Sequence, residues 1–287
     1  MRTRKPTIAI IGPGNLGSAM ARALHAAGYR VTEIVHHGKN SARRARTLAR
    51  EVKARVVHAS EASPAADIAW ICVGDSAIAA CAAELAKRGG WRGKLAFHSS
   101  GALGSRELKA LQKAGTAVAS VHPMMTFVRD ATPELKGVTF AIEGDARAAR
   151  AARQITHDLG GRVVKISVAR KPLYHALGAF TSPLIVATIA AAERLARKVG
   201  LDKATAQATV GPILQQTVRN YLKQGTAGAF SGPLVRGDVE TVKRHLKVLQ
   251  ADAEARAAYV ALARSAMKSL PVKNKKEIRR LLKKHSG

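Results

Sequence analysis

The chain has 287 residues, long enough for two domains, and its 47% hydrophobic and 23% charged residues are typical of a globular protein. The two cysteines, Cys72 and Cys81, indicate neither a disulfide framework nor a zinc site, and no cluster of metal ligands is visible. The formal net charge of +29 is spread along a chain with few aromatic residues, which favours a solvated basic surface over a nucleic-acid partner.

The first motif is a glycine-rich turn between a predicted buried strand, residues 7–11, and a predicted helix, residues 16–27. In such a turn the first glycine permits the tight bend, the second lets a pyrophosphate approach the backbone, and the third lets the helix pack against the strand. The free N–H groups of the helix then face the anion. The motif therefore predicts a dinucleotide site formed by Gly12, Gly14, Asn15, Leu16 and Gly17.

The end of the second predicted strand, residues 29–35, favours NADP(H) over NAD(H). An NAD-binding unit carries an acidic residue here that binds the ribose 2′-hydroxyl, whereas Glu33 lies inside the strand and is expected to face solvent. Basic and polar side chains that suit a 2′-phosphate follow instead, and the predicted contacts are His37, Lys39, Asn40, Ser41 and Arg43. An exposed helix face is the other interpretation of the arginines.

Three later strands are predicted to end in polar residues at one edge of a parallel sheet, where ligands bind in such folds. Gly74, Asp75 and Ser99 are expected near the cofactor, and Ser100 near the substrate. His98 and His122 are expected to line the catalytic cleft. Each histidine alone is equally compatible with a structural role, and Asp75 with a helix N-cap.

The alternation of strands and helices continues to about residue 167, and the sequence is helical and alanine-rich afterwards. We therefore predict an α/β Rossmann domain over residues 1–168, with a mostly parallel, doubly wound sheet, followed by an all-α domain over residues 169–287. Residues 176–192 carry no charge, but the segment is short for a membrane span and contains Pro183, so a helix buried between domains or subunits is favoured. The N-terminus runs directly into the first strand, which predicts a cytoplasmic protein without a signal peptide.

Two features of the helical half suggest chemistry. Lys171 and His175 are four residues apart and share a helix face. Lys171 is expected to protonate the atom that gains a hydride, with His175 orienting it, although a solvent-facing lysine is the alternative. Arg236, in the glycine-rich loop before Asp238, is expected to hold a substrate carboxylate, and Asp238 to cap the next helix.

These motifs together resemble a group of two-domain NADP-dependent enzymes that includes pyrroline-5-carboxylate reductase, ketopantoate reductase and the 6-phosphogluconate/β-hydroxyacid dehydrogenases. The chain is more closely similar to bacterial Rossmann-like oxidoreductases whose helical C-terminal half is a domain of unknown function. The resemblance implies NADP(H) binding and a homodimer formed through the helical domain. In the β-hydroxyacid dehydrogenases, however, an asparagine lies four residues after the catalytic lysine, where this chain has His175. The substrate of those enzymes therefore does not transfer.

The sequence thus predicts an NADP(H)-dependent oxidoreductase that transfers a hydride to or from a small carbonyl or imine compound, with an anionic substrate favoured. A non-catalytic sensor or scaffold that binds NADP(H) is the alternative, because a glycine-rich turn indicates binding rather than catalysis. An RNA-binding role driven by the basic surface is a weaker third hypothesis, and no membrane partner is expected.

Overall fold

The computed structural model describes residues 4–62, 65–129, 131 and 133–284. The chain divides between Pro183 and Leu184 into two compact units, and each is described by itself. The predicted boundary after residue 168 lies just after the last strand of the sheet. The division between the compact units comes later, so helix α6 (Lys171–Thr181) belongs to the same unit as the sheet.

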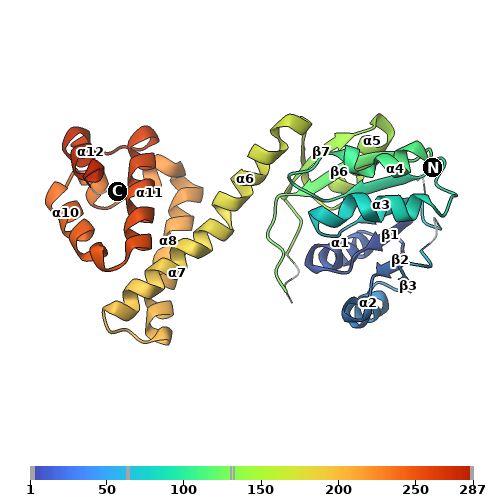
Figure 1. The fold of residues 1–287 in the computed structure, drawn as a ribbon, viewed down its shortest axis with the longest axis horizontal. Coiled ribbons are helices and arrows are strands. Elements are labelled where there is room, and N and C mark those ends of the chain that lie inside the picture. The colour runs from blue at the N-terminus through green and yellow to red at the C-terminus, as the bar shows by residue number, and fades with distance from the viewer. Residues whose placement is uncertain (1–3, 63–64, 130, 132, 285–287) are drawn as a thin grey trace. The chain divides into compact units, whose positions relative to one another are not determined.

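The first unit is built on a sheet that has eight strands among the described residues, in the order β3-β2-β1-β4-β5-β6-β7-β8 (Figure 1). All neighbouring strands are parallel except β6 and β7, which are antiparallel. This arrangement confirms the predicted mostly parallel Rossmann sheet. The strands are β1 Ile8–Ile11, β2 Val31–His36, β3 Arg55–His58, β4 Ile68–Ile71, β5 Leu95–His98, β6 Ala117–Pro123, β7 Thr139–Gly144 and β8 Arg162–Val164.

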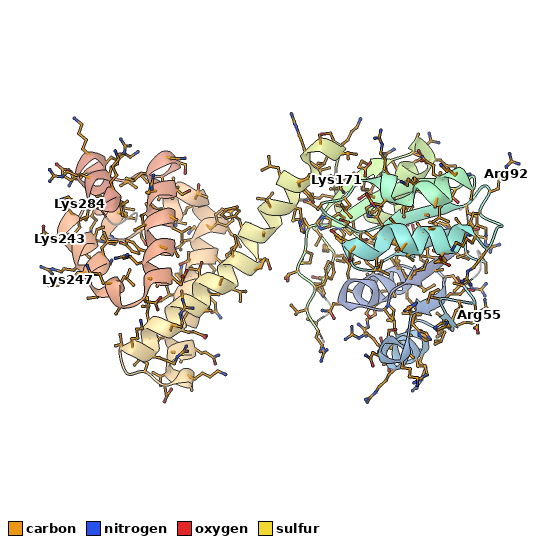
Figure 2. All side chains as sticks on the ribbon, viewed as in Figure 1. Arg55, Arg92, Lys171, Lys243, Lys247 and Lys284 are labelled. Atoms are coloured by element: carbon orange, nitrogen blue, oxygen red, sulfur yellow. The ribbon has the colours of Figure 1, made fainter. Side chains whose placement is uncertain are left out.

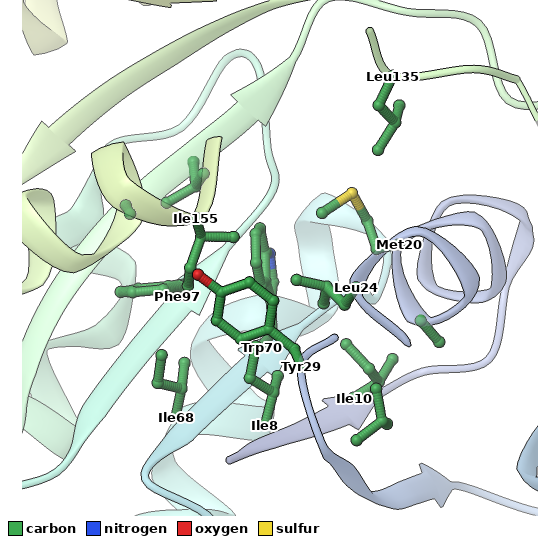
Figure 3. Packing of buried hydrophobic residues seen from close by; sticks show 14 of the residues in the cluster. Ile8, Ile10, Met20, Leu24, Tyr29, Ile68, Trp70, Phe97, Leu135 and Ile155 are labelled. Atoms are coloured by element: carbon green, nitrogen blue, oxygen red, sulfur yellow. The ribbon is translucent and has the colours of Figure 1, made fainter. Parts of the chain in front are cut away.

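Helices cover both faces of this sheet, which is why its strands are almost continuously apolar. Ile10 packs into one core cluster with Met20 of α1, while the next residue, Ile11, packs into a second cluster with Ile78 of α3. Figure 3 shows the first cluster around Trp70, whose ring lies 5.3 Å from that of Phe97. The helical segments of this unit are α1 Asn15–Ala26, α2 Lys39–Glu51, η1 Asp75–Ala77, α3 Ile78–Ala86, η2 Ser105–Leu108, α4 Lys109–Lys113, α5 Ala146–Asp158, η3 Val168–Arg170 and α6 Lys171–Thr181.

The prediction that Glu33 faces solvent is wrong. Its side chain is 1% exposed, and its carboxylate accepts a hydrogen bond from the Arg55 guanidinium on β3 at 2.6 Å. Because β2 is an inner strand covered on both faces, a charged residue at this position is buried and requires a partner.

The second unit is helical in its described part and packs around Val242, Leu246, Val260, Ile278 and Leu282. Helix α12 contributes the last two of these residues and so docks through one face. The prediction of a loop up to Asp238 is wrong in part, because Arg236 ends a short helix, whereas Asp238 caps the next helix as predicted, by accepting a hydrogen bond from Thr241 N at 3.0 Å. The helical segments are α7 Pro183–Lys198, α8 Lys203–Ala229, α9 Pro233–Arg236, α10 Val239–Val248, η4 Leu249–Ala251, α11 Ala253–Ser269 and α12 Lys275–Lys283.

One stretch of the described chain, Val168–Lys198, is long and apolar enough to cross a membrane by length and composition, and none of its apolar window is buried in the single chain. This is weak support for a span, because the backbone breaks between α6 and α7 at Ser182, where φ is −134° and ψ is −84°. The apolar side chains Leu173, Leu177 and Phe180 of α6 are each more than half exposed.

Candidate active site

The turn between β1 and α1 has the geometry that its three glycines predict. Gly12 has a φ of +97°, and a Cβ there would lie 2.8 Å from the Cys72 carbonyl oxygen. A Cβ on Gly17 would lie 2.1 Å from the carbonyl oxygen of Gly12, so only glycine allows this approach of helix and strand. Gly14, by contrast, has no atom within 4 Å of its Cβ position. The backbone at Gly14 is therefore open to a ligand at the N-terminus of α1.

The two side chains that follow Gly14 point to different surroundings. The amide Nδ2 of Asn15 donates to the carbonyl oxygen of Phe127 at 3.2 Å, which ties the turn to the segment after β6. Leu16 packs against the core cluster of the α1 side. Both predicted cofactor contacts are half-buried beside the turn, and only Asn15 presents a polar side chain there.

A pocket of about 500 Å³ lies beside this turn, and Gly12 and His37 line it. The other predicted 2′-phosphate contacts lie elsewhere, because Asn40 and Arg43 line a separate groove of about 630 Å³. Lys39 is exposed at the first position of α2, and the Ser41 hydroxyl donates to the carbonyl oxygens of His37 and Gly38. The structure thus brings only His37 of this set to the pocket beside Gly12.

Ser100 is the centre of a polar network at the carboxyl end of β5. Its hydroxyl donates to Asp75 Oδ2 at 2.9 Å and accepts from the backbone N–H groups of Ala102 and Leu103. Its carbonyl oxygen accepts from Lys171 Nζ at 3.1 Å, and Lys171 also donates to Ser120 Oγ at 2.7 Å. The segments that follow β4 and β5, the middle of β6 and the start of α6 are therefore joined around Ser100.

Lys171 is buried, with 1% of its surface exposed, so the alternative of a solvent-facing lysine is wrong. Figure 2 marks its position at the start of α6. Burial lowers the pKa of its ammonium group, and the carboxylates of Glu143 and Asp75 oppose this shift. Because two oxygen acceptors hold the buried ammonium group of Lys171, it is a hydrogen-bond donor with a fixed position at the carboxyl end of the sheet.

His98 is fully buried, and both of its ring nitrogens are engaged. Nε2 lies 3.0 Å from the carbonyl oxygen of Gly104, and Nδ1 accepts from the backbone N–H of Ser100 at 3.1 Å. These partners assign the proton to Nε2. Burial lowers the pKa of His98 to about 4. The ring therefore holds the loop from Ser100 to Gly104 in place and has no free nitrogen for a substrate.

Gly74 and Ser99 flank the Ser100 network. Gly74 precedes the short helix η1, in which Asp75 is the first residue. The Ser99 hydroxyl accepts from the indole N–H of Trp70 at 2.8 Å, which anchors it to the core. Arg236 lies in the second unit, at the end of α9.

His122, Tyr174 and His175 form an aromatic group next to the network. The ring of His122 lies 5.6 Å from that of Tyr174 and 5.9 Å from that of His175, edge to face in both cases. Within the described residues, His122 Nδ1 and the Tyr174 hydroxyl are buried without a hydrogen-bond partner. A Cβ on Gly101 would lie 2.7 Å from His122 Nε2 and 2.6 Å from His175 Cδ2, so glycine lets the loop touch both rings.

The charge state of this aromatic group follows from its surroundings. Burial, followed by the positive charge of Lys171, lowers the pKa of His122 to about 4. Burial raises the pKa of Tyr174 to about 12. At neutral pH both side chains are therefore uncharged, and each retains an unused hydrogen-bonding atom.

A second cavity, of about 460 Å³, opens on this group. His122 and His175 line it, together with apolar and small polar residues that include Met124, Met125 and Phe127. No charged side chain is among its described lining residues, and Lys171 stands behind it rather than in its wall. The described residues hold no group of three or more His, Cys, Asp or Glu side chains that could bind a metal ion.

Sequence reasoning missed Ser120, Gly101 and His58. Ser120 had a usable signal, since it is a polar residue inside an otherwise apolar run that forms β6. His58 ends β3 at the same sheet edge as the residues that were identified. Gly101 had no signal, because the contact of its Cβ position with two distant histidines depends on the fold.

Comparison with known proteins supports the same organisation. Among solved structures, the chain is similar to a protein of Bacteroides fragilis described as an NADP oxidoreductase, with 24% identity, a TM-score of 0.76, and coverage of 91% of this chain and 97% of the other. It is similar to an imine reductase of Myxococcus stipitatus in complex with NADP+ (18% identity, TM-score 0.64, coverage 98% and 100%) and to a pyrroline-5-carboxylate reductase of Coxiella burnetii (17%, 0.60, 99% and 100%). Identities this low establish a shared fold.

A search of curated proteins found no match. Residues 1–123 match the Rossmann-like domain, and residues 138–266 match a domain of unknown function, DUF2520. The chain therefore combines a Rossmann-like domain with a DUF2520 domain, as the resemblance of its motifs implied.

Proposed function

We propose that the protein is an NADP(H)-dependent oxidoreductase that transfers a hydride to or from the carbon of a small carbonyl or imine compound. The observation that carries this proposal is that two features lie together at the carboxyl end of the sheet. The open backbone at Gly14 and the cavity lined by His122 and His175 both lie at the carboxyl ends of the parallel strands. A redox cofactor and a substrate would be brought together there.

The chain's residues fit a dinucleotide. A pyrophosphate would meet the backbone of Gly14 and the free N–H groups of α1, and the adenosine half would enter the pocket beside Gly12. Solved structures of the same fold include an imine reductase with NADP+ and a reductive aminase with NADPH. NADP(H), once bound, would supply or accept the hydride.

The protein's part in the chemistry is to move a proton and stabilise charge. When a C=N or C=O group is reduced, its nitrogen or oxygen gains a proton as the carbon gains the hydride. His122 and His175 line the cavity, with Tyr174 beside them, and would contact that atom in the proposed reaction. Lys171, held by Ser100 and Ser120, would supply positive charge and the proton, and the imidazole of His122 or His175 would relay that proton to the substrate.

The volume and lining of the cavity indicate what kind of substrate it can hold. The volume of about 460 Å³ suits a small molecule, and the uncharged lining suits a carbonyl or imine carbon with an apolar substituent. An anionic substrate would need a cation from outside this lining, and Arg236 at the end of α9 stays the proposed anchor for its carboxylate.

We also propose that the protein acts as a homodimer formed through its helices. Val218, Tyr221 and Leu222 share one face of α8 by their spacing, and each is more than half exposed. Soluble monomers rarely expose such apolar stripes, and a second copy of the same stripe is the natural cover for it.

The test begins with titrations of NADPH and NADH by nicotinamide fluorescence. Turnover of small keto acids and cyclic imines is then measured by the loss of NADPH absorbance. Selective NADPH binding with turnover of any one compound supports the proposal. NADPH binding without turnover across the panel supports the sensor or scaffold instead, and binding of neither nucleotide refutes both.

The Lys171→Ala and Lys171→Met variants separate the lysine's chemistry from its packing, because methionine keeps most of the buried volume without the charge. Both variants are expected to lose turnover by about a hundredfold or more while still binding NADPH. Unchanged turnover in Lys171→Met would remove Lys171 from the mechanism.

A further inference from the structure

Three histidines gather at the carboxyl ends of β2 and β3. His36 and His58 are the last residues of these strands and are paired in register, and His37 follows directly. The ring of His58 lies 6.1 Å from that of His37, nearly parallel, and 5.4 Å from that of His36, edge to face. All three rings line the pocket of about 500 Å³ that reaches Gly12.

The hydrogen bonds within this group leave part of it free. His58 Nδ1 accepts from the backbone N–H of Ser60 at 3.2 Å and contacts the Ser60 hydroxyl at 2.6 Å, so the orientation of its ring is fixed. His36 Nδ1 lies 3.3 Å from the Gly38 carbonyl oxygen. In the part of the chain that the structure describes, the ring of His37 and Nε2 of His58 have no hydrogen-bond partner.

In the Rossmann arrangement, a dinucleotide with its pyrophosphate at Gly14 places its adenosine ribose at the end of β2. His37 and His58 border that place, whereas Arg43 lines the separate groove. We propose that His37 and His58 together bind the 2′-phosphate of NADP(H), so that the preference for NADPH over NADH weakens as the pH rises. The inference rests on the proposed function, because it assumes that a dinucleotide occupies this pocket.

The preference for NADPH is expected to depend on pH because the proposed donors to the phosphate are imidazole side chains. An imidazole changes charge between about pH 5 and 8, and only its protonated form adds an ionic attraction to a phosphate. NADH lacks the phosphate, so its affinity is expected to change little.

The other charged residues that line the pocket are Glu84 of α3 and Arg88, which follows α3, while Lys39 is exposed at the first position of α2 and does not line it. Glu84 pairs with Lys87, and the Arg88 guanidinium donates to the carbonyl oxygen of Ser60. Side chains of these types ordinarily change charge outside the range of about pH 6.5 to 8.5. Cys81 also lines the pocket, and burial raises the pKa of its thiol to about 11. Among the side-chain types at this pocket, imidazole is therefore the one that ordinarily changes charge in that range, and a phosphate monoester has already lost most of its second proton at about pH 6.5.

The experiment measures dissociation constants of NADPH and NADH for the full-length protein at about pH 6.5, 7.5 and 8.5. Over this range the ratio of NADH to NADPH dissociation constants is expected to fall about tenfold, the scale of one charge-assisted hydrogen bond. The His37→Asn and His58→Asn variants should lower the ratio at the acid end and flatten its dependence on pH. His37→Arg should keep the ratio high at every pH, because guanidinium stays charged.

His157→Asn, on the exposed surface of α5, is the matched control and should behave as the wild type. A ratio that is independent of pH, or one that the variants leave unchanged, overturns the inference while NADPH binding still supports the proposed function. Binding of neither nucleotide by the wild type overturns the proposed function itself. Thermal unfolding of each variant distinguishes a loss of binding from a loss of the fold.

Discussion

At the scale of single residues, the site depends on a polar network that is centred on Ser100. Its carbonyl oxygen receives the Lys171 ammonium group, and its backbone N–H donates to His98. An uncharged His98 ring is required, because a second ring proton would face the Ser100 N–H donor. The network is therefore sensitive to the protonation of a residue that no ligand touches.

We expect acid to destabilise the protein through His98. Its pKa is lowered from 6.5 to about 4 in the folded chain, so between these values the unfolded state binds a proton that the native state does not. The stability that this group contributes is present above pH 6.5 and is lost as the pH falls to about 4, up to about 3 kcal/mol.

Urea unfolding at a series of pH values measures this slope. His98→Asn should be less stable than the wild type at neutral pH, because it loses one of the two ring contacts, but it should show a shallower loss between pH 6.5 and about 4. An equal slope in the two proteins would show that His98 is not the group responsible.

For the residues of the candidate site, the sequence predicted their positions better than their roles. The ends of the strands follow from apolar runs, so His98, Ser100 and His122 could be placed at the carboxyl end of the sheet. Whether a ring nitrogen is free depends on the path of the loop, and the carbonyl oxygen of Gly104 that engages His98 carries no sequence signal. The same holds for Glu33, whose burial depends on the strands on either side of it.

At the scale of elements, the turn from β1 to α1 offers a matched pair of substitutions. Gly14 has a φ of −70° and open space at its Cβ position, so Gly14→Ala should change the free energy of unfolding by less than about 0.5 kcal/mol. The added methyl group would stand where the pyrophosphate approaches, and NADPH affinity should fall about tenfold or more.

Gly17→Ala should behave in the opposite way. Its Cβ would lie 2.1 Å from a backbone oxygen, and the helix must move away from the strand, at a cost of about 2 to 3 kcal/mol of stability. Fluorescence titration and urea unfolding of both variants check the pair. A Gly14→Ala protein with full NADPH affinity would mean that no pyrophosphate lies at this turn.

The direction of strand β7, which is antiparallel to β6, cannot be predicted from the apolar pattern of the strand itself. Apolar runs such as those of β6 and β7 look alike in either direction, and direction is set by the connection between them. A parallel return needs a crossover, usually a helix, and residues 124–138 contain no helical pattern. The reversal at β6 could thus have been predicted from the missing helix, whereas its exact register could not.

At the scale of the whole molecule, the exposed apolar stripe on α8 predicts a dimer. Light scattering after size exclusion should give the mass of two chains of 30.4 kDa. Leu222→Glu, at a side chain that is 76% exposed, should shift the protein to the mass of one chain without unfolding it. Val199→Glu, at a side chain that is 79% exposed in the connection after α7, is the control and should leave the dimer intact. A wild-type protein with the mass of one chain would refute this assembly, and recovery with detergent or lipid would favour the apolar segment as a membrane contact.

The pairing of β6 with β7 also limits how the protein can be divided. A fragment that ends at Pro123 would turn β6 into an edge strand and leave the hydrogen-bonding groups that now pair with β7 without partners. It would also uncover Val121, which packs in one cluster with Phe140 and Ile142 of β7. Such a fragment is expected to aggregate, so the smallest self-sufficient piece of the Rossmann-like half must extend at least through β8.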